Sequence, residues 1–221
     1  MTKVVIISGA TASGKSALAF DFAACRDVAI INADALQIFQ GLPILSAQPS
    51  LQEKLQVPHF LYSHLKFNES VSVGLWLDLV SDIIQKVLAQ NKVPLIVGGS
   101  GMYISKLFDG ISQVPEISAS VKKEVRELYQ ELGRQDFIKK LREIGENSEI
   151  ENLDKQRLIR LYEVLKETKK TLKFWQESSK KFIFDPKIFI HINLEIERKK
   201  LYENCNLRFE KMLENGAVEE V

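Results

Sequence analysis

The segment "GATASGKS" (residues 9–16) follows the apolar run "VVIIS" (4–8) and precedes the helix-like run "ALAFDFAAC" (17–25). A glycine, four variable positions and Gly-Lys-Ser between a strand and a helix form the pattern of a phosphate-binding loop. Glycines let such a loop turn tightly and direct several N–H groups into one concavity at the helix start, where the helix dipole favours an anion. Lys15 opposes that dipole unless an anion lies between them, and Ser16 offers a hydroxyl to Mg²⁺. We expect the phosphates to be bound by Gly9, Ala10, Thr11, Ala12, Ser13, Gly14, Lys15 and Ser16.

The composition is typical of a soluble globular protein of one domain or two small ones. The chain has 221 residues, of which 45% are hydrophobic and 27% charged, and its net charge is +1. No apolar run approaches the roughly 18 residues of a membrane helix, and the N-terminal run leads into the loop without the layout of a signal peptide. The two cysteines, Cys25 and Cys205, lack the spacing of metal ligands or of a disulfide framework. We therefore expect a cytoplasmic protein without membrane contact.

Strand and helix patterns alternate along most of the chain. Further strands are predicted at 28–33, 60–67, 93–99 and 187–194, and helices at 73–91 and 194–216. This alternation predicts an α/β fold of the P-loop type, in which helices cover both faces of a parallel sheet. Ligands bind at the carboxyl ends of the strands in such sheets, which is where the loop lies.

The middle of the chain has a different character. Residues 113–174 are charged and helical in period, and 121–174 hold 14 Lys/Arg against 11 Asp/Glu. We expect a small α-helical insert there, and a core formed by 1–112 and 175–221. The excess positive charge indicates either an anionic partner or two ordinary solvated helices.

The strand pattern at 93–99 does not fit an ordinary triphosphate enzyme. Such enzymes need an acidic residue at the end of a neighbouring strand to hold Mg²⁺, whereas "VPLIVGG" ends in glycines. These glycines indicate a close backbone approach, for example to a ligand. The acidic residue is instead Asp34, directly after the strand at 28–33. Asp34 is either a general base facing the acceptor or simply a helix cap.

Two arginines fall on the apolar face of the last predicted helix. Arg198 and Arg208 share that face with Leu194, Leu201, Cys205 and Met212, at steps of three and four residues. A buried arginine needs an anionic partner. That partner is either a structural carboxylate or a diphosphate, which the planar guanidinium binds well.

Five more segments stand out, in chain order: "INADALQIFQGLPILSAQP" (31–49), "VPHFL" (57–61), "VGGSGMYI" (97–104), "DKQRLIRLYEVL" (154–165) and "RFEKMLENGAVEEV" (208–221). The first four resemble the patterns D-S-x-Q-x-Y with G-T-A-K-P, V-P-H-H-L, V-G-G-T-G-L-Y and N-D-x-x-R-x-x-R-A-L-E-V of the tRNA dimethylallyltransferase (tRNA isopentenyltransferase) family. The last is similar to a helix near the end of that family's catalytic core, and the loop resembles its G-P-T-A-S-G-K-[ST]. Together these segments resemble this family specifically, because they cover most of the chain and occur in the same order as in the family.

The resemblance implies that the loop holds the diphosphate of dimethylallyl diphosphate. The prenyl group would pass to N6 of the adenosine immediately 3′ of a tRNA anticodon. Lys15, Arg208 and a Mg²⁺ held partly by Ser16 would stabilise the leaving diphosphate, with Arg198 as a second candidate. Asp34 would accept a proton from the attacking amine. We expect a monomer that needs no membrane and has the tRNA anticodon arm as its partner.

The resemblance also implies two sets of tRNA contacts. The adenosine must leave its stack to reach a buried pocket. The residues expected at the flipped base are Asp34, Ala35, Leu36, Gln37 and Ser100. Those expected at the anticodon arm are Lys122, Gln156, Arg157, Leu158, Ile159 and Arg160.

The chain departs from the family pattern at several positions. Ala10 replaces a proline, Ala35 replaces a serine beside the base, and Asn204 stands where the family tends to have an arginine. "LSAQP" lacks the glycine and lysine of G-T-A-K-P, and "ENLD" replaces H-P-N-D. Family members also continue past the position of Val221 into helices that help grip tRNA. Two alternatives therefore stay open: a small-molecule P-loop kinase, and a non-catalytic remnant that binds anticodon arms.

Overall fold

A computed structural model describes residues 3–146, 148–178 and 180–221. The chain divides into two compact units, one made of Met1–Asp109 with Phe182–Val221 and the other of Gly110–Lys181. The second unit is wider than the expected insert at 113–174. It begins and ends with two short antiparallel strands, β5 (Ile111–Ser112) and β6 (Lys180–Lys181), which are too short to leave a periodic signal in the sequence.

The first unit is built on a five-stranded parallel sheet. Its strands are β1 (Val4–Gly9), β2 (Val28–Asn32), β3 (His59–Phe60), β4 (Val93–Gly98) and β7 (Phe189–Leu194), in the order β3-β2-β4-β1-β7. The predicted α/β fold with a parallel sheet is confirmed. The central strands read as continuous apolar runs because helices cover both of their faces.

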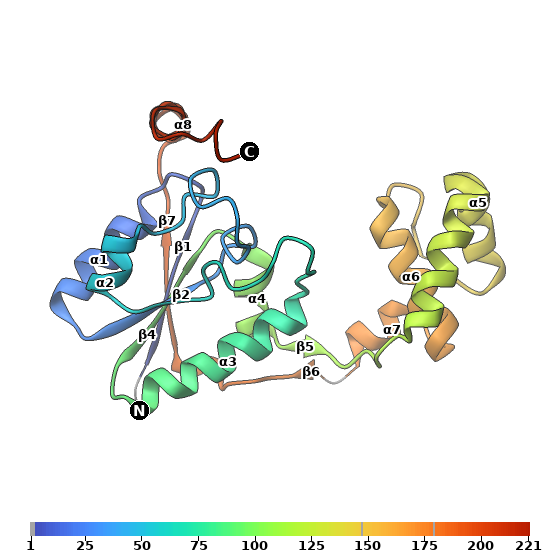
Figure 1. Ribbon diagram of the computed structural model, residues 1–221. Helices are drawn as coiled ribbons and strands as arrows, with labels where there is room; N and C mark the ends of the chain where they lie inside the picture. The colour runs from blue at the N-terminus through green and yellow to red at the C-terminus, as the bar shows by residue number, and fades with distance from the viewer. Residues whose placement is uncertain (1–2, 147, 179) are drawn as a thin grey trace. The chain divides into compact units, whose positions relative to one another are not determined.

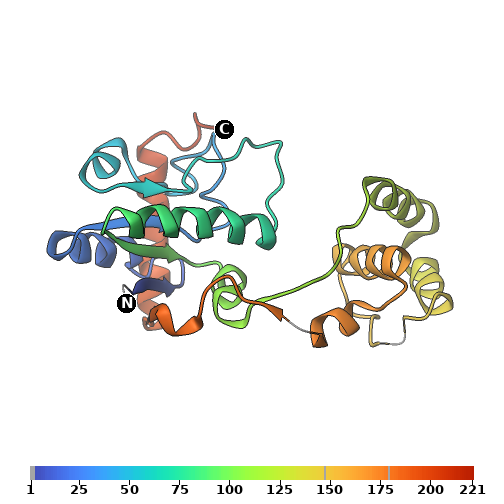
Figure 2. The same ribbon diagram turned by 90° about the horizontal axis from the view of Figure 1, so that it is seen from below.

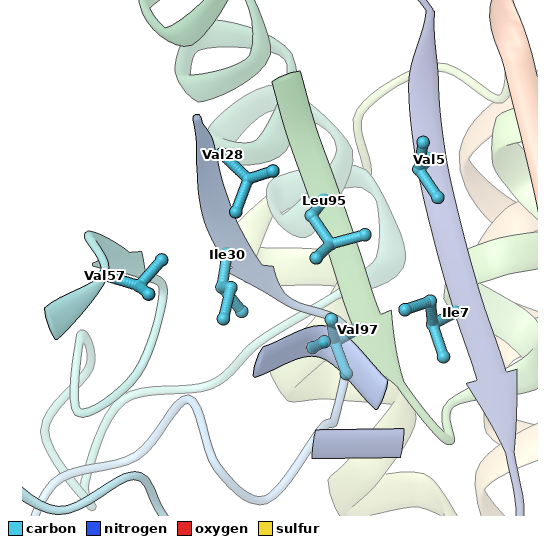
Figure 3. Close-up of a cluster of buried hydrophobic side chains, with 8 residues drawn as sticks. Val5, Ile7, Val28, Ile30, Val57, Leu95 and Val97 are labelled. Carbon is cyan, nitrogen blue, oxygen red and sulfur yellow. The ribbon is translucent and has the colours of Figure 1, made fainter. Parts of the chain in front are cut away.

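Helix α1 (Lys15–Cys25) packs on one face of this sheet, and α3 (Val73–Ala89) with α4 (Gly101–Asp109) packs on the other (Figure 1). On the α1 face, alternate residues of β1, β2 and β4 form one buried cluster with Val57, drawn in Figure 3: Val5, Ile7, Val28, Ile30, Leu95 and Val97. The α3 face buries Trp76, whose ring stacks on Tyr103 of α4 with centroids 4.7 Å apart. In the part of the chain that the structure describes, no helix combines the length and apolarity needed to cross a bilayer.

The strand predicted at 60–67 is wrong in its length. Only His59 and Phe60 pair with β2, and Leu61 and Ser63 then adopt positive φ values of 62° and 48°. A left-handed backbone cannot continue a strand, so the chain turns away after two residues. The segment before β3 instead forms α2 (Leu51–Gln56), which begins with a reciprocal capping box between Ser50 and Glu53.

The last strand is followed by α8 (Arg198–Glu214), and a short 3₁₀ turn at Pro186–Ile188 precedes that strand. Figure 2 shows α8 along its length. The expected apolar face of this helix is barely buried, since Met212 is the one α8 residue below a tenth exposed, and Arg198 is exposed. The expectation that both arginines lie on a buried stripe is therefore wrong.

The second unit is a small helical domain with its own core. It contains α5 (Ala119–Glu143), α6 (Lys155–Thr168) and α7 (Leu172–Glu177). Helix α5 bends at Gly133, whose φ of 68° and ψ of −178° are not helical. The buried residues that fill this core are Val125, Phe137, Leu141, Ile150, Leu158, Ile159, Leu161 and Tyr162.

Candidate active site

A cavity of about 550 Å³ opens at the carboxyl ends of β1, β2 and β4, where a parallel sheet is expected to bind its ligand. One wall is the phosphate loop, a second is the chain after β2, and a third is α8. The residues that line it are Thr11, Ala12, Ser13, Gly14, Lys15, Ser16, Ala17, Asp34, Leu36, Gln37, Leu45, Ser46, Ala47, Tyr62, Val97, Gly98, Asn204, Leu207, Arg208 and Lys211. Two of the predicted loop residues, Gly9 and Ala10, line a different hollow on the other side of the loop.

The predicted phosphate loop, residues 9–16, turns tightly between β1 and α1. Ala12 and Gly14 adopt positive φ values of 61° and 91°, which fold the loop into a concavity just before α1. A side chain at Gly9 would lie 2.8 Å from the Leu194 carbonyl oxygen, so this position accepts only glycine. The Ser13 Oγ atom is buried and has no hydrogen-bond partner among the described residues.

Lys15 links the loop to the other walls electrostatically. Its Nζ donates to the Ala10 carbonyl oxygen at 2.6 Å. Burial lowers the pKa of Lys15, the Asp34 carboxylate raises it, and the Arg208 guanidinium lowers it again. These three predicted catalytic residues therefore act on one another, and Lys211 adds a further cation to the same cavity. Three cations against one carboxylate suit a multiply charged anion.

The backbone of Asp34 is held by hydrogen bonds to a buried asparagine. Asn32, which is fully buried, donates to the Asp34 and Leu61 carbonyl oxygens at 2.9 and 3.0 Å and accepts from the Asp34 N–H at 2.8 Å. The Asp34 Oδ1 accepts from the Leu36 N–H at 2.9 Å, and a turn follows, so the alternative in which Asp34 caps a helix is wrong. Asp34 thus closes a short turn with one oxygen while its side chain lines the cavity.

The glycines at the end of β4 leave room for neighbouring backbone atoms of the protein. A side chain at Gly98 would collide with Ala33, directly after β2, at 2.1 Å from its carbonyl, and one at Gly99 would lie 3.3 Å from the Gly9 oxygen, so the protein's own chain makes the expected close backbone approach. Ser100 continues this contact, because its N–H donates to the Ala33 oxygen at 3.1 Å and its Oγ accepts from the Ala35 N–H at 2.9 Å. The predicted base-contacting residues Ala35 and Ser100 are thereby brought together.

Gln37 holds a wall of the cavity in place. Its Nε2 donates to the carbonyl oxygens of Ser46 and Ala47 at 2.9 and 2.7 Å. Both amide hydrogens are then used, so Gln37 can offer a ligand only its Oε1. Leu36 is 71% exposed and is free to contact a large substrate.

The sequence reasoning did not name Asn32, Tyr62 or Lys211 at this cavity, and it named Asn204 only as a departure from the family pattern. Tyr62 lies where the cavity meets a smaller one of about 150 Å³. Burial, Asp34 and Glu53 all raise the pKa of Tyr62, so its phenol stays a hydrogen-bond donor. Lys211 could have been found from the sequence, since it lies one turn beyond Arg208 on the same helix face.

The two arginines of α8 have different surroundings. Arg208 lines the cavity, whereas the Arg198 Nε donates to the Tyr202 hydroxyl at 2.9 Å on the exposed side. Arg208 has no carboxylate within 4.0 Å among the described residues. The structure thus favours Arg208 over Arg198 as the residue that meets an anion.

The predicted anticodon-arm residues all lie in the second unit, and two of them are corrected. Leu158 and Ile159 are 0% and 8% exposed, so their side chains fill the core of that unit and cannot contact RNA. They face inward because the outward face of the same turn carries Gln156 and Arg157, both exposed.

Arg157 and Arg160 are not equivalent. Arg157 is paired with Asp154 at 3.4 Å on the surface, and Arg160 lies 3.7 Å from Glu163, whose side chain is only 7% exposed. Arg160 therefore also neutralises a buried carboxylate. Lys122, at the start of α5, is partly buried.

Comparisons with known proteins agree with this geometry. A family model described as IPP transferase matches residues 37–221. The tRNA dimethylallyltransferase of Pelagibacter ubique is 36% identical over 222 residues, which are 100% of this chain and 71% of that protein. The tRNA dimethylallyltransferase of Wolbachia pipientis wMel is 38% identical over 223 residues, 99% of this chain and 73% of that protein.

Solved structures are similar as well. The full-length tRNA isopentenylpyrophosphate transferase from Bacillus halodurans is 26% identical with a TM-score of 0.64, and the match covers 100% of this chain and 69% of that one. A eukaryotic dimethylallyltransferase acting on tRNA has a TM-score of 0.76 at 23% identity, and this chain spans 55% of its length; that likeness supports the fold alone. With a matching family model, relatives at this identity and a phosphate loop facing Asp34 and Arg208, the chain belongs to the IPP transferase family.

Proposed function

We propose that this chain transfers the dimethylallyl group of dimethylallyl diphosphate to N6 of the adenosine immediately 3′ of a tRNA anticodon. The observation that carries the proposal is the cavity in which the phosphate loop, Arg208 and Lys211 face the carboxylate of Asp34. Cations on one side and a single base on the other suit a reaction in which an anion leaves and a proton is lost. The relatives named tRNA dimethylallyltransferase support the same reaction.

The diphosphate would lie in the concavity of the loop. The N–H groups at the start of α1 and the ammonium of Lys15 would bind its oxygens, with Arg208 on the opposite side. Charge develops on the diphosphate as the C1–O bond breaks, so these groups bind most tightly at the transition state. Lys211 is close enough in the same cavity to share this role.

The acceptor amine would approach C1 from the side of Asp34. The nitrogen lone pair forms the new C–N bond while the electrons of the C1–O bond leave with diphosphate. Asp34 then takes one proton from N6, which restores a neutral amine. Asn32 keeps the backbone of Asp34 fixed, and Ser100 holds Ala35 beside it, so the base is positioned before the substrate arrives.

We also propose a Mg²⁺ ion with the diphosphate, held by the Ser16 hydroxyl. Ser16 lines the cavity at the start of α1, and Mg²⁺ commonly takes few protein oxygens and completes its shell with phosphate oxygens and water. The bound ion would neutralise part of the charge on the leaving group.

The tRNA would be bound through surface cations of the second unit, and of the two predicted arginines Arg157 is the more exposed. Every residue invoked here belongs to one chain, so we propose that a monomer is sufficient, in the cytoplasm where tRNA is modified.

The direct test is incubation with dimethylallyl diphosphate, Mg²⁺ and unmodified tRNA, followed by mass spectrometry of the nucleosides. We expect adenosine to gain one dimethylallyl group. ATP in place of dimethylallyl diphosphate serves as the control for kinase activity. Binding of the anticodon arm without any modified adenosine would contradict the proposed catalysis, and phosphorylation with ATP would indicate a kinase.

A further inference from the structure

We propose that α8 and the residues after it, 198–221, form a clasp over the cavity. It is fastened at Asn204 and Glu220, which act as positioning residues through Arg208. The inference deepens the proposed function, because it assigns the diphosphate site two residues that do not themselves touch the reacting atoms.

Apolar packing alone does not fix the position of this helix. Met212 is the buried residue of α8, while Tyr202, Leu207, Phe209 and Leu213 are 53%, 54%, 55% and 44% exposed. A helix with so little buried surface can rotate or shift unless polar contacts hold it. Figure 1 shows α8 end-on, with the C-terminal turn beside the loops that follow β2.

The first fastening joins α8 to the phosphate loop. The Asn204 Nδ2 donates to the Ala12 carbonyl oxygen at 3.2 Å, and the Cys205 Sγ lies 3.9 Å from the Thr11 carbonyl oxygen. Ala12 is the non-glycine residue of this loop that adopts a left-handed backbone. Asn204 therefore supports the conformation of the loop and sets the rotation of the helix at the same contact.

Arg208 and Lys211 follow on the same face. They lie four and seven residues after Asn204, so all three project toward the cavity, which each of them lines. A slip of the helix by one residue would turn that face by about 100°, because there are 3.6 residues per turn. The guanidinium would then leave the diphosphate site.

The second fastening lies beyond the C-terminal end of α8. Glu220 accepts from the Ile44 N–H at 2.7 Å and from the Leu45 N–H at 2.9 Å, one with each carboxylate oxygen. Leu45 and the two residues after it line the cavity, and Gln37 binds the same loop from the other side. The clasp thus runs from the phosphate loop to the 44–47 loop, with Arg208 between its two ends.

The test compares two clasp variants with two matched controls. Asn204→Leu removes the donor at similar volume, and Glu220→Gln removes the charge and one acceptor oxygen. Asn206→Leu and Glu219→Gln make the same changes at exposed neighbours. Binding of inorganic diphosphate by calorimetry is expected to weaken about fivefold to tenfold in each clasp variant and to stay unchanged in the controls. The KM for dimethylallyl diphosphate should rise and the KM for tRNA should not.

A double-variant measurement separates positioning from general damage. If Asn204 acts through Arg208, then Asn204→Leu should add almost nothing to the loss already caused by Arg208→Ala. Additive losses, or clasp variants that bind diphosphate as tightly as the controls, would overturn the inference.

Amide hydrogen exchange tests the fastening without any ligand. Exchange across 198–214 should be faster in both clasp variants than in their controls, while β1 and β4 stay protected. Unchanged exchange would show that the contacts do not hold the helix. A wild-type chain that binds no diphosphate would instead refute the proposed function, and the exchange result would still decide the clasp.

Discussion

The cavity has two kinds of wall, and they are held by different forces. The wall formed by β1, β2 and β4 is supported by buried strand residues such as Ile6, Ile31 and Ile96, which are 0% exposed. Asn32, which is also fully buried, supports it as well. The α8 wall has Met212 as its one buried residue and depends on two hydrogen-bonded contacts, one from Asn204 within the helix and one from Glu220 beyond its C-terminal end. Asp34 and the predicted phosphate loop are therefore held by the core of the sheet, whereas Arg208 opposite them is held by a few replaceable contacts.

The largest effect is expected on the rigid wall, at Asp34. Asp34→Asn keeps the shape and can still accept the Leu36 N–H, but it cannot take a proton. The rate of prenyl transfer should fall about 10²- to 10⁴-fold while both substrates still bind. Single-turnover kinetics with calorimetric binding would check this, and an unchanged rate would show that Asp34 is not the base.

Lys15→Ala should be nearly as damaging, since it removes a cation that faces the developing charge. We expect a loss of roughly 10²- to 10³-fold in rate and weaker diphosphate binding, with no loss of stability. Thermal melting serves as the control, because a lysine that opposes the helix dipole does not stabilise the free protein. Near-normal turnover would refute the diphosphate site.

The same lysine gives the site a pH dependence. Burial lowers the pKa of Lys15, so in the free protein the ammonium loses its proton at a pH below the usual value of 10.5. Diphosphate binding should weaken as the pH rises through that lowered pKa, and Lys15→Ala should lack this phase. The same phase in the variant would assign it to another group.

The free energy of unfolding should respond very differently to a substitution in each of the two walls. Asn32→Leu leaves the Asp34 N–H and the carbonyl oxygens of Asp34 and Leu61 without their buried partner. The free energy of unfolding should fall by roughly 3 kcal/mol, as expected for several unsatisfied buried groups.

Arg208→Ala should instead change the free energy of unfolding by less than about 0.5 kcal/mol while weakening diphosphate binding. A steep loss of stability in Arg208→Ala would mean that α8 is held by more than its clasp contacts.

The smallest effect concerns the second unit. Arg157→Ala should reduce the salt dependence of tRNA binding by about one unit of slope and leave diphosphate binding unchanged. Arg157 is the suitable position because Arg160→Ala would also leave Glu163 buried without its nearby cation. An unchanged slope would mark Arg157 as an ordinary surface charge.

The sequence by itself determined the parts of the protein that depend on local pattern. Strand patterns predicted β1, β2, β4 and β7, the spacing of glycines, lysine and serine predicted the phosphate loop, and the position directly after the strand at 28–33 singled out Asp34. Such features are visible because each depends on residues within one turn or one strand. Leu158 and Ile159 were misassigned for a related reason: a motif matches whole segments, whereas helical period decides which of its residues face the core.

Only the tertiary structure decided how distant segments meet. Gly98 at the end of β4 leaves room for Ala33, Asn204 reaches the loop 192 positions earlier, and Glu220 binds a loop 175 positions before it. It also decided that Arg208 enters the cavity while Arg198 faces outward, although both share one predicted stripe. Helical period fixes which residues share a face, but contacts with the rest of the fold fix where that face points.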